Sequence, residues 1–118
     1  MTKENKLIRW FDELTIDDVP VVGGKNASLG EMYQQLTPQG ILIPNGFATT
    51  AYAYRDMLEQ AGAWQKLHAV LDDLDPDDMT DLARRGTQAR EIVYAAGLPK
   101  QLQNEIIEAY AKLKDQYG

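Results

Sequence analysis

The stretch that most constrains the fold of this 118-residue chain covers residues 22–32, which read VGGKNASLGEM. Gly23 and Gly24 stand immediately before a helical pattern, and Lys25 falls in or just before its first turn. The apolar residues that follow recur at i, i+3, i+4 and i+7, the spacing of one helix face: Leu29, Met32, Tyr33 and Leu36. The sequence therefore predicts a helix that begins after the glycines and ends before Pro38, because proline disfavours helical geometry in the residue before it.

The glycines and the lysine at this helix start suit an anion site. Glycines let backbone N–H groups turn toward an anion, and a helix amino terminus adds about half a positive charge. A lysine there is unfavourable by roughly 0.3–1 kcal/mol unless an anion is nearby. The stretch is not a Walker A loop, which needs glycine where Val19 stands and Ser or Thr where Asn26 stands. Spacing alone leaves two interpretations, a phosphate site at Gly23, Gly24 and Lys25 or a glycine turn with a solvated lysine.

Outside this stretch the sequence predicts a mainly helical α+β domain with about five helices and two or three short strands. The strand candidates are two short apolar runs, residues 7–11 and 41–43. Residues 15–22, which contain two adjacent aspartates and Pro20, are predicted to form a loop. The composition changes near Pro44, and the sequence after it is helical in pattern.

Helical patterns dominate the second half of the chain. One helix is expected from residue 51, with Thr49 or Thr50 as its cap and Gly62 as its stop, and a short helix follows over residues 64–71. Both patterns place apolar residues at helical spacing, so each helix is expected to bury one face.

Two longer helices are predicted to complete the chain. The run Asp75-Pro76-Asp77-Asp78 signals a start, since aspartate can cap and proline suits the first helical position, and Gly97 ends this helix. The last helix opens at Pro99 and is expected to form a main wall of the core. Its apolar stripe is the most regular in the sequence: Leu102, Ile106, Ala109, Tyr110, Leu113 and Tyr117.

Two glycines interrupt the helical patterns. Gly30 and Gly86 each cost about 1 kcal/mol relative to alanine in a helix interior. Close packing of another element against each glycine is the expected compensation.

Composition and charge exclude several classes of function. The net charge of −6 opposes binding to a nucleic-acid backbone, and no apolar run approaches the ~20 residues of a membrane span. The chain has no cysteine, which excludes disulfides and thiol chemistry and fits a reducing cytoplasm. No signal peptide is visible at the amino terminus. The sequence therefore predicts a cytoplasmic protein without nucleic-acid or membrane partners.

Other chemistry-bearing residues fit no known site. His68 is the only histidine and Ser28 the only serine, so neither a zinc site nor a hydrolase triad is supported. The acidic residues 72–81 lack the glycine and the final glutamate of a calcium loop. This run is interpreted as a helix start with a solvated acidic face.

Two blocks of sequence resemble a known enzyme family. Residues 22–32 resemble the amino-terminal signature of the phosphoenolpyruvate synthase (pyruvate, water dikinase) family, and residues 43–55, IPNGFATTAYAYR, fit the same family in order and spacing. Weaker similarities extend over nearly the whole chain. Pyruvate phosphate dikinase is a near relative, but the NASLGE wording and the AYR after the threonines look more like the synthases.

The resemblance implies a role in phosphoryl transfer. Enzymes of this family convert pyruvate to phosphoenolpyruvate with ATP and magnesium, through a phosphohistidine. Their amino-terminal portion is an ATP-grasp nucleotide-binding domain, in which the lysine of the Gly-Gly-Lys block contacts the ATP phosphates. The resemblance therefore implies that Lys25 contacts the ATP phosphates. It implies for Gly23 and Gly24 only that they shape the loop.

The same resemblance implies that residues 1–118 are an incomplete, amino-terminal part of that domain. The family's Val-Arg-Ser-Ser strand, second ATP-grasp lobe, phosphohistidine domain and pyruvate-binding barrel would then be partners within a longer protein. We expect the 118 residues alone to be inactive, with no catalytic and no metal-binding residue among them. The alternatives are a non-catalytic helical interaction module derived from this domain, or the equivalent piece of a pyruvate phosphate dikinase.

Overall fold

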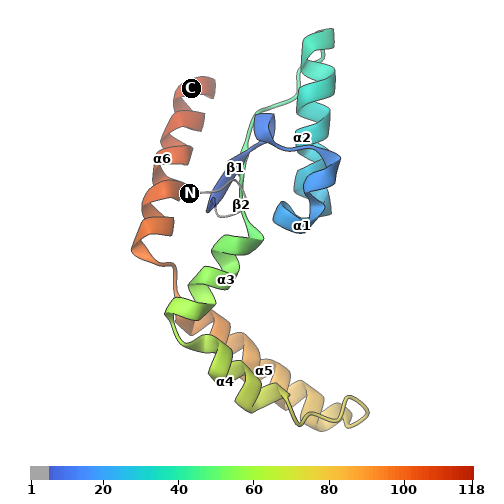
Figure 1. The fold of residues 1–118 in the computed structure, drawn as a ribbon, viewed down its shortest axis with the longest axis vertical. Coiled ribbons are helices and arrows are strands. Elements are labelled where there is room, and N and C mark those ends of the chain that lie inside the picture. The colour runs from blue at the N-terminus through green and yellow to red at the C-terminus, as the bar shows by residue number, and fades with distance from the viewer. Residues whose placement is uncertain (1–5) are drawn as a thin grey trace. The chain divides into compact units, whose positions relative to one another are not determined.

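The computed structural model describes residues 6–118 as a mainly helical α+β chain with one two-stranded sheet, as predicted (Figure 1). It divides into two compact units. Unit 1 comprises the chain up to Tyr54 together with Lys100–Gly118, and unit 2 comprises Arg55–Pro99. Among the helices of residues 6–118, none combines the length and apolar character that a bilayer span demands.

The sheet of unit 1 pairs β1 (Ile8–Trp10) with β2 (Phe47–Thr49) in antiparallel register, with Arg9 opposite Ala48. The rings of Trp10 and Phe47 lie opposite each other with centroids 5.4 Å apart. The strand predicted over residues 7–11 is therefore confirmed.

The strand predicted over residues 41–43 is wrong, because the second strand begins at Phe47, four residues after Ile43. The N–H of Ile41 donates to the carbonyl of Leu36 at 3.2 Å and so closes the end of a helix instead of joining a ladder. Pro44 has no N–H to offer a neighbouring strand, and the Leu42 side chain is 96% exposed. The backbone N–H of Phe11 instead reaches the Gly46 carbonyl at 3.0 Å, just before β2.

Residues 16–22 are helical, so the loop predicted over residues 15–22 is also wrong. They form a 3₁₀ turn, η3 (Ile16–Asp18), and the short helix α1 (Val19–Val22). The Thr15 N–H donates to the Asp18 carboxylate at 3.0 Å, and the Thr15 hydroxyl accepts from the N–H of Asp17. Pro20 lies in the first turn of α1, where its missing N–H costs no hydrogen bond.

The predicted first long helix is α2 (Gly24–Leu36), which ends where Pro38 required. Its most buried residues are Ala27 and Gly30, whereas Met32 of the predicted apolar face is 42% exposed. The buried face is thus the one with the smallest side chains. The reason is that α2 lies very close to the fully buried Leu14, and only a face with small side chains allows this close contact.

The helices after β2 are α3 (Ala51–Gln60), α4 (Ala63–Leu71), α5 (Met79–Ala96) and α6 (Lys100–Tyr117). Thr50 caps α3, because its hydroxyl accepts from the Ala53 N–H at 3.0 Å. Gly62 and Gly97 end their helices as predicted. Trp64 lies in α4 with 38% of its surface exposed.

The start predicted for α5 at Pro76 is wrong by three residues. Asp75 is engaged in a turn, because its carboxylate accepts from the Asp77 N–H at 3.0 Å. Asp78 is the cap instead, since its carboxylate accepts from the Asp81 N–H at 3.1 Å.

Three small clusters make up the core of residues 6–118. In unit 1, one lies around Leu14, Val22, Ala27 and Ala48, and another joins Leu7, Ala53 and Leu102. In unit 2, Met57, Leu58 and Ala63 pack with apolar residues of α4 and α5. The cluster around Leu14 is the one that supports the helix start singled out by the sequence.

Candidate functional site

The candidate site is the junction between α1 and α2, where Gly23 is the single residue between the two helices. Its φ of +86° lies in the region that favours glycine. The Gly23 N–H donates to the Val19 carbonyl at 2.8 Å, and the Gly23 carbonyl accepts from the Ala27 N–H at 3.0 Å. A single residue thus ends one helix and caps the next. The helix begins at Gly24 instead of after both glycines.

The three predicted site residues lie together on the surface. Gly23, Gly24 and Lys25 are all exposed, and a Cβ atom placed on either glycine would meet nothing within 4 Å. The first N–H groups of a helix have no carbonyl partner within it, and the first turn of α2 contains no acidic side chain. Lys25 in this first turn therefore adds its charge to the positive end of the helix. The arrangement leaves an open, positively charged surface that an anion can reach.

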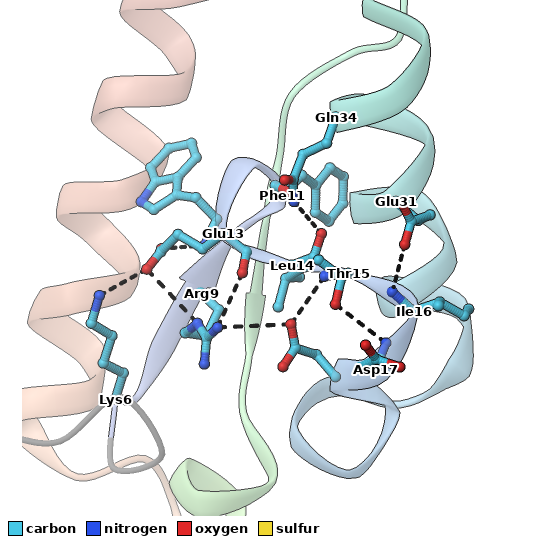
Figure 2. A network of polar contacts seen from close by, with 12 residues as sticks. Lys6, Arg9, Phe11, Glu13, Leu14, Thr15, Ile16, Asp17, Glu31 and Gln34 are labelled. Atoms are coloured by element: carbon cyan, nitrogen blue, oxygen red, sulfur yellow. Dashed lines mark hydrogen bonds and ion pairs between the residues drawn. The ribbon is translucent and has the colours of Figure 1, made fainter.

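The opposite side of α2 is anchored firmly. A Cβ atom on Gly30 would lie 2.4 Å from the Leu14 Cβ and 2.9 Å from the Leu14 carbonyl oxygen. The Gln34 side chain donates to the carbonyl of Leu14, and the Glu31 carboxylate accepts from the Ile16 N–H at 3.0 Å (Figure 2). Close packing at Gly30 was expected and is present, whereas Gly86 has only the Arg90 guanidinium near it, at 3.5 Å. The exposed residue Lys25 thus belongs to a helix whose other side packs closely against the segment around Leu14.

A network of charged side chains connects β1 with the turns that precede α1 and was not predicted (Figure 2). Arg9 of β1 is 1% exposed, and its Nη2 atom donates to the Glu13 carbonyl at 3.1 Å. The guanidinium also lies 3.8 Å from a carboxylate oxygen of Glu13 and 3.9 Å from one of Asp18. Lys6 forms a second ion pair with Glu13 at 2.7 Å. The signal in the sequence is a lone charge inside the apolar run LIRWF.

Glu13 has a perturbed acidity within this network. Burial alone would raise the pKa of Glu13. The hydrogen bonds from Lys6 and from the Trp10 N–H lower it, as do the charges of Lys6 and Arg9. These effects outweigh burial, so the pKa of Glu13 lies below the ordinary 4.5. Glu13 is therefore ionised at neutral pH and contributes a fixed negative charge next to Arg9.

The acidic residues 72–81 belong to unit 2 and act as ion-pair partners. Arg85 pairs with Asp73 and, at 2.8 Å, with Asp81. The hydrogen bond and charge of Arg85 lower the pKa of Asp73. Within residues 6–118 no group of three or more His, Cys, Asp or Glu side chains could hold a metal ion. The interpretation of this run as a solvated acidic face is consistent with these contacts.

Comparison with known proteins places these features in a family. The model of the family "Pyruvate phosphate dikinase, AMP/ATP-binding domain" matches residues 19–118, which include the whole candidate site. The chain belongs to this family. Within the AMP/ATP-binding domain family, this chain is 51% identical over 116 residues to the phosphoenolpyruvate synthase of Synechocystis sp.. It is 47% identical over 107 residues to that of Escherichia coli and 43% identical over 115 residues to that of Aquifex aeolicus.

These matches cover nearly all of this member of the AMP/ATP-binding domain family but little of its relatives. They span 98% of the chain and 14% of the Synechocystis protein, and 91% of the chain and 14% of the Escherichia coli protein. The chain thus corresponds to about one seventh of the length of the curated relatives it matches.

Proposed function

We propose that this chain supplies part of the ATP-binding lobe of a phosphoenolpyruvate synthase and that Lys25 binds the nucleotide phosphates. The observation that carries the proposal is the exposed Lys25 in the first turn of a helix that Gly23 caps, with no acid in that turn. A lysine is favourable there when an anion is bound, because the anion neutralises both the side chain and the helix end. Gly23 and Gly24 keep the surface open for the approach of phosphate oxygens.

The parent reaction that we infer is the ATP-dependent phosphorylation of pyruvate to phosphoenolpyruvate through a phosphohistidine. Phosphoryl transfer depends on positioning and on neutralisation of phosphate charge, which is the part that Lys25 can perform. The names of the relatives described above support a synthase over a dikinase. In this proposal residues 1–118 form the amino-terminal part of an ATP-grasp domain. The second ATP-grasp lobe, the phosphohistidine domain and the pyruvate-binding barrel belong to the rest of that protein.

Magnesium would act in this reaction as the counterion of the bound nucleotide. No metal-binding group is found among residues 6–118, so we assign none of them to magnesium. The absence of cysteine from the sequence supports a reducing cytoplasmic location.

The test of the proposal is ATP titration of the full-length protein that carries this sequence, with Lys25→Ala beside the wild type. Loss of a charged hydrogen bond should weaken ATP binding by roughly 10- to 150-fold. Lys66→Ala is the matched control, because Lys66 is exposed on α4 of unit 2 and should leave the dissociation constant unchanged. Equal constants for wild type and Lys25→Ala would exclude this role for Lys25. That outcome would favour the interaction module, in which the lysine is merely solvated.

A further inference from the structure

The buried Arg9 is the feature of unit 1 that the proposed phosphate site does not yet explain. Its side chain is among the largest that are fully buried, and it lies on the middle residue of the three-residue strand β1. Burying a guanidinium is costly unless its charge is paired. An apolar side chain could occupy this position without that cost, so the contacts made by the charge are what distinguish Arg9.

The contacts of Arg9 connect β1 to the turn that precedes α1. One contact is with the carbonyl of Glu13, which ends the 3₁₀ turn η2 (Phe11–Glu13), at 3.1 Å. Another is the ion pair with Asp18 at 3.9 Å, whose carboxylate is only 19% exposed. The same carboxylate oxygen of Asp18 accepts from the Thr15 N–H at 3.0 Å and so closes the turn η3. The Arg9 guanidinium thus contacts both 3₁₀ turns, η2 and η3, that lie between β1 and α1 (Figure 2).

The position of Asp18 affects the position of Gly23 through the short helix α1, which lies between them. Asp18 immediately precedes α1, and α1 is a single turn that ends at Gly23 through the hydrogen bond from the Gly23 N–H to the Val19 carbonyl. The Asn26 side chain donates to the Val22 carbonyl at 3.0 Å, which joins α1 to the first turn of α2. A shift of Asp18 would therefore displace the backbone N–H groups next to Lys25.

Two cations face two carboxylates in this network. Lys6 pairs with Glu13 at 2.7 Å, and Arg9 lies 3.8 Å from the same Glu13 oxygen and 3.9 Å from Asp18, so Arg9 is the cation that links the two carboxylates. Without Arg9, the Asp18 carboxylate keeps its contact with Thr15 but loses its attachment to β1. An apolar side chain can fill the buried volume but cannot replace this attachment, so the stability of the fold and the placement of the turn can be separated.

We propose that Arg9 is a positioning residue for the phosphate site, holding the turn at Asp18 so that Gly23 presents the start of α2 in its binding geometry. This inference rests on the proposed function, because it assigns Arg9 a role only if Lys25 binds phosphate. In this proposal, Lys25 and the backbone N–H groups at the start of α2 bind the phosphate, and Arg9 does not contact it.

The test combines hydrogen exchange without nucleotide and ATP titration, both on the full-length protein that carries this sequence. In Arg9→Met, amides of residues 15–26 should exchange faster, while amides of α6 should keep the wild-type rate. The ATP dissociation constant should rise about tenfold. Arg9→Lys keeps the charge but not the two-sided contact and should fall between wild type and Arg9→Met. Arg90→Met, an exposed arginine of unit 2, is the control and should match the wild type.

A second variant keeps the test decisive if Arg9→Met does not fold. Asp18→Asn retains the side-chain volume and the acceptor for the Thr15 N–H, and removes only the charge that faces Arg9. It should accelerate exchange in residues 15–26 in the same way. Unchanged exchange in that segment, or faster exchange throughout the chain, would overturn the positioning role. If Lys25→Ala weakens ATP binding and Arg9→Met does not, this inference fails; if neither does, the proposed function fails.

Discussion

Gly30 is the point of closest approach between α2 and the residues that follow β1. A Cβ atom there would overlap the Leu14 Cβ at 2.4 Å, and one of its other neighbours is the Leu14 backbone carbonyl, which cannot rotate away. Gly30→Ala should therefore lower the free energy of unfolding by about 1–3 kcal/mol, the usual cost of overpacking. Urea denaturation at neutral pH measures this change.

Gly86→Ala provides the matched control, because Gly86 also lies inside a helix but has open space around it. Among the residues that the structure describes, a Cβ atom on Gly86 would meet only the flexible end of Arg90, at 3.5 Å, beyond the helix's own backbone. Alanine should raise the free energy of unfolding here by about 0.5–1 kcal/mol, since it restricts the unfolded chain and favours the helix. Equal effects of the two substitutions would contradict the packing described at Gly30.

Glu13 makes the stability of unit 1 dependent on pH. Its pKa in the folded protein lies below the ordinary 4.5, so its contribution to stability is complete above pH 4.5. The contribution declines as the pH falls through the lower pKa of the folded state, because protonation removes the charge that Lys6 and Arg9 face. The difference in unfolding free energy between wild type and Glu13→Gln should therefore shrink in acid. A difference that stays constant from neutral pH to pH 3 would contradict this account.

Among the elements, α6 shows how one apolar stripe divides into a buried and an exposed part. Leu102 and Ala109 are each 4% exposed, whereas Tyr110 and Tyr117 are 63% and 57% exposed. The expectation that this helix forms a main wall of the core thus holds for the part up to Ala109. The Tyr117 hydroxyl accepts from the Asn45 N–H at 2.6 Å, so its ring lies on the surface with a polar contact.

The first half of α6 should therefore contribute most of the stability of this helix. Leu102→Ala removes a buried side chain that packs with Leu7 and Ala53, and should lower the free energy of unfolding by about 2–5 kcal/mol. Ile107→Ala on the same helix is the control, because Ile107 is 65% exposed and should change stability by less than about 0.5 kcal/mol. Thermal melts of both variants measure the difference. Similar losses for the two would show that Leu102 is not a core residue.

Across the whole molecule, the elements with long helical periodicity were predictable from the sequence, whereas of the short ones only β1 was predicted in place. Helices α2 to α6 follow from apolar spacing, caps and glycine stops. The error at residues 41–43 arises because a three-residue apolar run carries no information about which backbone groups it can pair with. The error at residues 15–22 has another cause, since the hydrogen bonds of Thr15 and Asp18 turn a segment that contains Pro20 into helix.

The candidate site also has a part that the sequence predicts and a part that it does not. Gly23, Gly24 and Lys25 are adjacent in sequence, so their spacing alone placed them at one helix start. Arg9 meets Asp18 only after the chain has folded through two 3₁₀ turns, and no local pattern indicates that contact. The supporting residues of a site depend on tertiary contacts, which periodicity does not report.

The two tryptophans of the chain divide one to each unit, with Trp10 on β1 and Trp64 on α4. Trp10 stands next to Arg9 in the strand, and its backbone N–H is bound to Glu13 at 2.9 Å. With Trp64→Phe, the tryptophan emission of this chain, excited at a wavelength that tyrosine does not absorb, would therefore come from Trp10 alone. Its emission maximum and its quenching by iodide would report on the half of the chain that carries Lys25. The sequence thus contains its own optical probe of that half, which needs no added dye.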